Sequence, residues 1–167
     1  MQTYAQTDIL EAVRKVIGDQ KPEACYQCMK CTSGCPAAKV SDYRPHLMVI
    51  LTKAGLAEEV MQSGIIWACS MCLKCKEYCP QDVAPFDVVT ALKNVAISRG
   101  YKPPEMLVGM ANSVLDYGYI MDKPMTITTT EFEEVSRESL GLPDIAHPKD
   151  IEKFKKFVSS FGYRRLS

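Results

Sequence analysis

The sequence predicts a mostly α-helical protein in which two cysteine loops lie between helices. Apolar residues recur at intervals of three and four along most of the 167-residue chain, which is the spacing of one helix face. Prolines and glycines stand where these segments begin and end. All eight cysteines fall into two copies of one pattern, so they form a feature separate from the helices.

The first hundred residues contain three predicted helices. Gly18 ends the first, whose apolar stripe is Ile9, Val13, Val16 and Ile17. Pro45 opens the second and Gly55 ends it; its expected buried face is Leu47, Ile50, Leu51 and Ala54. Pro85 opens the third, which ends at Gly100 and carries Phe86, Val89, Leu92 and Ala96.

Pro103 and Pro104 mark a boundary beyond which no cysteine occurs. We therefore expect a ligand-bearing domain over residues 1–101 and a helical C-terminal extension, suited to docking a partner, over residues 102–167. The first helix of the extension is expected to end near Gly118, with an apolar face of Leu107, Met110, Ala111 and Val114.

The rest of the extension contains one β-like run and two further predicted helices. The β-like run is 125–129, which could pair with the edge of a partner's sheet. Thr130 and Glu133 have the spacing of a capping box, which predicts a helix through Phe132 and Val135 that stops before Gly141 and Pro143. A last amphipathic helix is predicted from Ile151, Phe154, Val158 and Phe161.

Charge and hydropathy exclude several classes of protein. Twenty Lys and Arg residues balance twenty Asp and Glu residues, so no overall basic excess points to nucleic acid. No segment is long and apolar enough to span a bilayer, and the N-terminus lacks the features of a signal peptide. We expect a soluble, cytoplasmic protein, and in that compartment clustered cysteines are more often metal ligands than disulfides.

The cysteine spacing predicts two [4Fe–4S] clusters. Each copy reads C-x-x-C-x-x-C-x-x-x-C-P, the ligand pattern of bacterial ferredoxins, in which the fourth cysteine binds the other cluster. The expected ligands of cluster 1 are Cys25, Cys28, Cys31 and Cys79, and those of cluster 2 are Cys69, Cys72, Cys75 and Cys35. The predicted fold is thus an α-helical ferredoxin with two cross-ligated loops and a C-terminal helical extension.

Cross-ligation would join loops that are 44 residues apart, so the metal-free protein should fold poorly. Structural zinc is the alternative, but zinc sites normally use two C-x-x-C pairs rather than a tight triplet followed by C-P. With every cysteine used as a ligand, no iron keeps an open position for substrate. The pattern therefore favours electron transfer, with no catalytic residue in the chain.

Other polar residues are given structural roles. His46 and His147 are interpreted as capping or surface residues, and neither is needed as a ligand. Gly34 could turn its N–H toward the cluster sulfurs in the first loop, where the second loop has Tyr78. The chain has neither G-x-G-x-x-G nor a P-loop, so a flavin or nicotinamide in a Rossmann unit is not indicated.

Three segments together resemble the C subunit of heterodisulfide reductase: residues 25–36 and 67–80 around the cysteines, and the Tyr-Arg-Pro sequence at 43–45. Ser-Arg-Gly-Tyr at 98–101 and Leu-Gly-Leu-Pro at 140–143 are also similar to that protein. The resemblance implies an electron relay between a flavin-containing A subunit and a B subunit with Cys-Cys-Gly motifs. In methanogens such a complex splits the mixed disulfide of coenzyme M and coenzyme B.

Two classes of function stay open at this point. The first is a relay subunit of a larger oxidoreductase, either of the methanogen type or of the related complexes of sulfur oxidisers. The second is a free ferredoxin-like carrier that docks transiently with several enzymes. The length of the chain beyond Gly100 favours the first class, because a small diffusible ferredoxin needs no such extension.

Overall fold

The computed structural model describes residues 7–17, 21–120, 126–128, 130–131, 133–143, 148–162 and 165. The chain divides into two compact units, Met1–Pro103 and Pro104–Ser167. Most of the described residues are helical, as the sequence predicts. The predicted helix stop at Gly18, together with Met125, Thr129, Phe132 and His147, lies outside the described residues.

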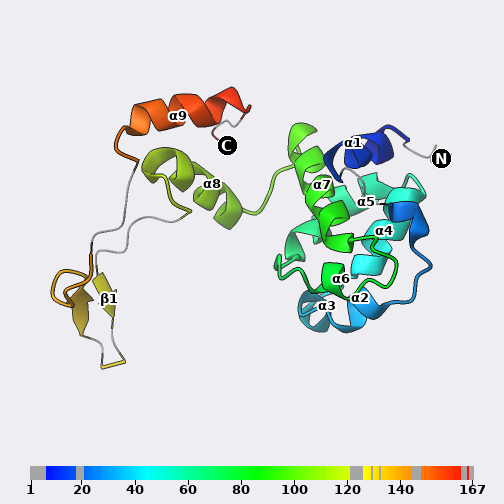
Figure 1. Ribbon diagram of the computed structural model, residues 1–167, viewed down its shortest axis with the longest axis horizontal. Coiled ribbons are helices and arrows are strands. Elements are labelled where there is room, and N and C mark those ends of the chain that lie inside the picture. The colour runs from blue at the N-terminus through cyan, green and yellow to red at the C-terminus, as the bar shows by residue number, and fades with distance from the viewer. Residues whose placement is uncertain are drawn as a thin grey trace. The chain divides into compact units, whose positions relative to one another are not determined.

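In the first unit, the long helix α7 packs against its neighbours α1, α4, α5 and α6 (Figure 1). The helices and 3₁₀ turns of this unit are α1 (Thr7–Ile17), η1 (Pro22–Ala24), α2 (Lys30–Ser33), α3 (Ala37–Val40), α4 (Pro45–Lys53), α5 (Ala57–Gln62), η2 (Ile65–Ala68), α6 (Lys74–Glu77) and α7 (Pro85–Ser98). Val88 and Leu92 of α7 are fully buried, so this helix supplies much of the core. Burying such side chains stabilises the fold by about 1.5–3 kcal/mol each.

The predicted starts and stops of α4 and α7 are confirmed. Both helices begin at a proline in the first helical position. Both are followed by a glycine with positive φ, Gly55 at +72° and Gly100 at +84°. The next N–H then reaches back to a helix carbonyl, from Leu56 to Leu51 (2.8 Å) and from Tyr101 to Ala96 (3.0 Å), which completes a Schellman motif in each case.

The predicted buried face of α4 is wrong. Leu47 is 40% exposed and Ala54 is exposed, whereas Met48, Val49 and Thr52 are buried. Apolar residues lie on several sides of this helix, so its pattern does not select one face. Thr52 can lie in the core because its hydroxyl donates a hydrogen bond to the Met48 carbonyl (2.7 Å).

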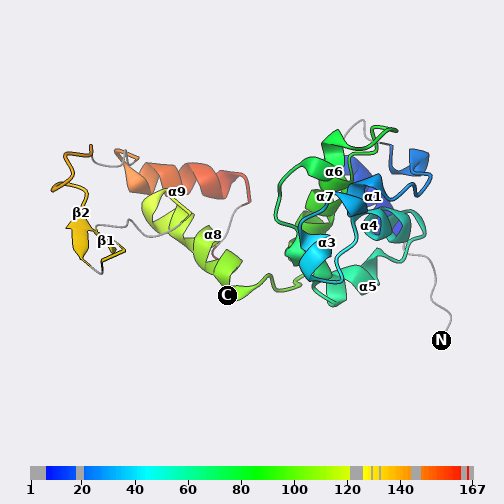
Figure 2. The same cartoon turned by 90° about the horizontal axis from the view of Figure 1, so that it is seen from below.

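The second unit contains α8 (Glu105–Tyr117), β1 (Thr126–Thr128), β2 (Glu134–Ser136) and α9 (Ile151–Ser160). Helices α8 and α9 pack against each other, as both ribbon views show (Figures 1 and 2). The predicted helices at α8 and α9 are confirmed. Within α8 the buried residue is Leu115, and the predicted face around Leu107 and Met110 is only half-buried.

The helix predicted from the capping box at Thr130 and Glu133 is wrong. Residues Glu134–Ser136 form β2, which pairs antiparallel with β1 and places Val135 opposite Ile127. Both of these residues are β-branched, a residue type that favours strands. The pairing of the two strands in a hairpin outweighs the helix signal of the capping box, so the β-like run pairs within its own chain.

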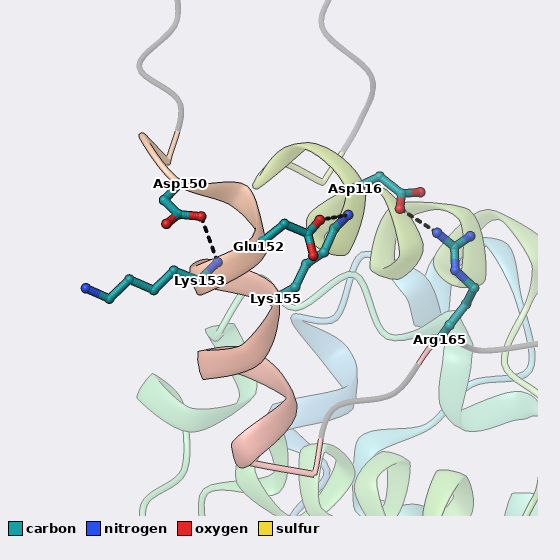
Figure 3. Close-up of polar contacts among 6 residues, drawn as sticks. All are labelled: Asp116, Asp150, Glu152, Lys153, Lys155 and Arg165. Carbon is teal, nitrogen blue, oxygen red and sulfur yellow. Dashed lines mark hydrogen bonds and ion pairs between the residues drawn. The ribbon is translucent and has the colours of Figure 1, made fainter.

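Local polar contacts in the second unit lie near the end of α8 and at the start of α9 (Figure 3). At the start of α9, the Asp150 carboxylate accepts a hydrogen bond from the Lys153 backbone N–H (2.9 Å). Glu152 and Lys155 form an ion pair at i, i+3 (3.1 Å). Arg165 pairs with Asp116 of α8, which attaches the chain after α9 to that helix.

Replacing Asp150 with Ala should destabilise α9 by about 1 kcal/mol, because the N-cap of the helix is lost. We expect the amides of Ile151–Ser160 to exchange with deuterium about fivefold faster, as measured by mass spectrometry. Glu152→Ala is the matched control, since it removes a carboxylate of the same turn whose exposed ion pair contributes about 0–1 kcal/mol. Equal acceleration in both variants would contradict the cap assignment.

Candidate metal centres

The two cysteine loops have the same backbone conformation. Each starts from a 3₁₀ turn, and the first cysteines have nearly equal dihedrals: φ −66°, ψ 117° at Cys25 and φ −63°, ψ 115° at Cys69. Each loop then has left-handed residues two and four positions on, which are Gln27 and Met29 in the first loop and Met71 and Leu73 in the second. The short helices α2 and α6 follow at equivalent positions.

Left-handed conformations in residues other than glycine cost about 1–3 kcal/mol each and persist where the surroundings require them. Here φ is +62° at Gln27 and +63° at Met29, and +57° and +64° at the equivalent Met71 and Leu73. Both loops are thus held in the same strained conformation around their cysteines.

Two cavities bring the eight cysteines together in two sets of four. The first, of about 320 Å³, is lined by Cys25, Cys28, Cys31 and Cys79. The second, of about 270 Å³, is lined by Cys35, Cys69, Cys72 and Cys75. Each cavity therefore meets three cysteines of one loop and the fourth cysteine of the other. Within the part of the chain that the structure describes, no group of three or more His, Cys, Asp or Glu side chains is positioned to hold a single metal ion.

The first three cysteines of each loop have the same pattern of burial. Cys28 and Cys72 are exposed, whereas Cys31 and Cys75 are buried. Burial, reinforced by the neighbouring cysteines, raises the pKa of Cys31 to about 11 and that of Cys75 to about 12. Without a cation these buried groups stay protonated, so a metal centre that binds thiolates would displace their protons.

Hydrogen bonds to sulfur occur in the first cavity. The Gln27 side-chain amide donates to Cys25 Sγ (3.0 Å), and the Val83 backbone N–H donates to Cys79 Sγ (3.3 Å). Donors of this kind stabilise negative charge on a thiolate. The position equivalent to Gln27 in the second loop is Met71, which has no such donor.

Two lysines, one for each loop, bind the backbone of the first cysteine, and sequence reasoning missed both. The Lys53 ammonium donates to the carbonyl oxygens of Glu23 (3.1 Å) and Cys25 (3.1 Å). The Lys93 ammonium donates to the Cys69 carbonyl (3.3 Å), and burial lowers the pKa of Lys93. Each lysine is the eighth residue after the proline that opens its helix, and this shared spacing could have identified the pair from the sequence.

Lys93 also lies over the ring of Trp67, with its ammonium 5.7 Å from the ring centroid. Trp67 is partly buried and packs against the hydrophobic core. Trp67 therefore contributes to core packing, and its ring additionally receives a cation on its face.

The interpretation of His46 as a capping or surface residue is wrong. Its exposed fraction is 9%, it lines the first cavity, and its Nδ1 is 2.6 Å from the Thr32 hydroxyl oxygen. Thr32 supplies the polar partner that lets the ring be buried, and that residue is 14 positions away in sequence. Burial and the nearby Arg44 lower the pKa of His46. At the equivalent position the second cavity has Phe86.

Gly34 does not turn its N–H toward a sulfur, because that N–H donates to the Lys30 carbonyl (3.3 Å). Its importance is spatial. A Cβ at this position would lie 2.8 Å from Cε2 of Tyr78, which occupies the equivalent position in the second loop. The absence of a side chain at Gly34 thus allows α2 to pack against α6.

Replacing Gly34 with Ala should therefore strain the contact between the loops. We expect a cost of about 1 kcal/mol and a fall in Tm of about 4–8 °C for the anaerobically purified protein. In a Tyr78→Ala background the same change should have no cost, because the obstructing ring is gone. Gly109→Ala, where an added Cβ meets nothing within 4 Å, is the control and should not lower Tm. A loss that persists without the Tyr78 ring would refute the steric explanation.

Comparison with known proteins gives the family of the chain. Residues 21–83, which include all eight cysteines, match the family described as a 4Fe-4S dicluster domain. The chain is 40% identical over 149 residues to the iron-sulfur C subunit of the CoB–CoM heterodisulfide reductase of Methanopyrus kandleri, covering 86% of this chain and 74% of the relative.

Two further relatives extend the match over nearly the whole chain. The chain is 29% identical over 157 residues to the C subunit of the H(2):CoB-CoM heterodisulfide,ferredoxin reductase of Methanothermobacter thermautotrophicus, covering 91% of this chain and 81% of the relative. It is 29% identical over 170 residues to the iron-sulfur C subunit 2 of the Methanocaldococcus jannaschii CoB–CoM heterodisulfide reductase, covering 95% and 86%. Among the described residues, no helix is both long and apolar enough to cross a membrane. The chain belongs to the family of heterodisulfide reductase C subunits.

Proposed function

We propose that the chain is a non-catalytic relay subunit that carries two [4Fe–4S] clusters between a flavin-containing A subunit and a Cys-Cys-Gly B subunit. The ligands of cluster 1 would be Cys25, Cys28, Cys31 and Cys79, and those of cluster 2 would be Cys69, Cys72, Cys75 and Cys35. The observation that carries this proposal is the lining of the two cavities, each of which meets three cysteines of one loop and one of the other.

The residues present fit such clusters in three respects. Each cavity has four cysteine sulfurs, the ligands that iron–sulfur clusters use. Both loops hold left-handed residues between their cysteines, a strained conformation that a bound centre would help to maintain. The hydroxyl of Tyr43 is buried against the second cavity with no hydrogen-bond partner among the described residues, and a sulfur acceptor there would satisfy it.

When bound, such clusters exchange single electrons with their partners. The chain determines on which side this exchange occurs. Cys31, Cys35 and Cys75 are buried, whereas Cys28 and Cys72 are exposed. The side chains next to the exposed cysteines, Met29 and Met71, are more than half exposed and apolar. We place electron input and output on these two exposed sides, where an apolar partner surface could exclude water.

The names of the relatives support membership of a heterodisulfide reductase complex. They describe an iron-sulfur C subunit of a reductase for the CoB–CoM heterodisulfide. We propose that the chain serves a reductase of this kind or one acting on a related disulfide. The residues of Pro104–Ser167, whose helix α8 has half-buried apolar side chains, would dock a partner protein.

The ligand sets predict which variants lose the same cluster. Anaerobically purified protein should hold about eight irons per chain, as two cubanes require. Cys35→Ala and Cys72→Ala should both abolish the electron paramagnetic resonance (EPR) signal of cluster 2. Cys79→Ala and Cys28→Ala should both abolish that of cluster 1. If Cys35→Ala instead removes the signal that Cys28→Ala removes, the cross-ligation is refuted.

The relay function predicts stable partners. A tagged chain purified anaerobically from its native cells should bring down a flavoprotein and a Cys-Cys-Gly protein in equal amounts. Reducing the flavin in this complex should reduce the two clusters, as followed by EPR. A chain that emerges alone with both clusters intact would exclude the relay function in a stable complex and favour the free ferredoxin-like carrier.

A further inference from the structure

Tyr43 is a buried polar residue whose hydroxyl lacks a partner. Its side chain is 1% exposed, and its hydroxyl makes no hydrogen bond to any of the described residues. An unsatisfied hydroxyl in the interior costs about 1–3 kcal/mol, so such groups are rare unless a bound group completes them.

The ring of Tyr43 lines the second cavity together with Cys35, Cys69, Cys72 and Cys75. A phenol is protonated at neutral pH, so the hydroxyl is available as a hydrogen-bond donor to a sulfur in this cavity.

The backbone at Tyr43 is fixed by several hydrogen bonds. The Tyr43 N–H donates to the Ser41 hydroxyl (3.3 Å). The Arg44 guanidinium donates to the carbonyl oxygens of Ala38 (3.2 Å), Ser41 (2.7 Å) and Tyr43 itself (2.9 Å). Pro45 then begins α4. The segment therefore holds the ring in one place, which a positioned donor requires.

The first cavity has no phenol at the equivalent position. Counting back two residues from the proline that opens each helix gives Tyr43 before α4 and Val83 before α7. Val83 lines the first cavity and offers only its backbone N–H to a sulfur. The first cavity is lined by another phenol, Tyr26, but that side chain is 59% exposed, whereas Tyr43 is buried. Gln27 donates a side-chain hydrogen bond to a sulfur of the first cavity, and its equivalent in the second loop is Met71. The two cavities thus differ in which donor they have and from where it comes.

We propose that Tyr43 donates its hydroxyl hydrogen to a sulfur of the cluster in the second cavity and raises the reduction potential of that cluster alone. The proposal rests on the proposed function. Reduction adds one electron, and the donor stabilises the extra negative charge while the proton stays on the phenol. Tyr43 thus gives the clusters of two similarly built sites different reduction potentials.

Tyr43→Phe in the cluster-loaded protein tests this directly. We expect the iron content to be unchanged and the ratio of reduced to oxidised cluster 2 at a fixed solution potential to fall about tenfold, a shift of about 59 mV for one electron. The potential of cluster 1 should not move. Tyr78→Phe is the matched control, because it removes a hydroxyl from a ring that lines neither cavity, and it should shift neither potential. Redox titration followed by EPR gives both values.

If Tyr43→Phe loses iron, a second variant still tests the proposal. Fluorotyrosine incorporated at position 43 keeps the ring and makes its hydroxyl a stronger donor, so the potential of cluster 2 should rise. Unchanged potentials, or a shift confined to cluster 1, would overturn the proposal. These outcomes differ from failure of the proposed function, which would appear in the unaltered protein as fewer than two clusters.

Discussion

The first unit depends on the packing of two cysteine loops that are far apart in sequence. Helix α2 lies against α6, and Gly34 allows this approach because a larger residue would collide with Tyr78. Only with the loops in contact can each cavity take its fourth cysteine from the other loop. The long helix α7 and its neighbours form the core that holds this arrangement.

Several features of the loops are unfavourable by themselves. Left-handed residues such as Met29 and Leu73 are strained, buried thiols such as Cys75 resist ionisation, and the Tyr43 hydroxyl lacks a partner. The proposed iron centre would bind the thiols as thiolates, accept the Tyr43 hydrogen bond at sulfur, and so offset the cost of the strained residues. The unfavourable local energetics of the loops are therefore tied to the function proposed for them, and the buried helices of the core must compensate for what remains.

The sequence predicts those features that one residue or one short spacing controls. Pro45 and Pro85 mark helix starts because proline suits the first helical position, and the cysteine pattern selects the residues that line the cavities. Features that depend on contacts between separate segments could not be predicted. His46 is buried because Thr32 meets its ring, and β2 forms because it pairs with β1. The assignment of particular cysteines to particular clusters stays a prediction that the cavity linings support.

The internal repeat separates what the backbone controls from what side chains control. Equivalent dihedrals at Cys25 and Cys69, and equivalent lysines eight residues into α4 and α7, give both cavities the same frame. Inside that frame the side chains differ, with His46 facing one cavity and Phe86 the other. Because reduction potential depends on burial and on hydrogen bonds to sulfur, one duplicated scaffold can hold two unequal centres. In the proposed relay the potentials of the two partners would set the direction of electron flow, and unequal centres would determine which cluster holds the electron between transfers.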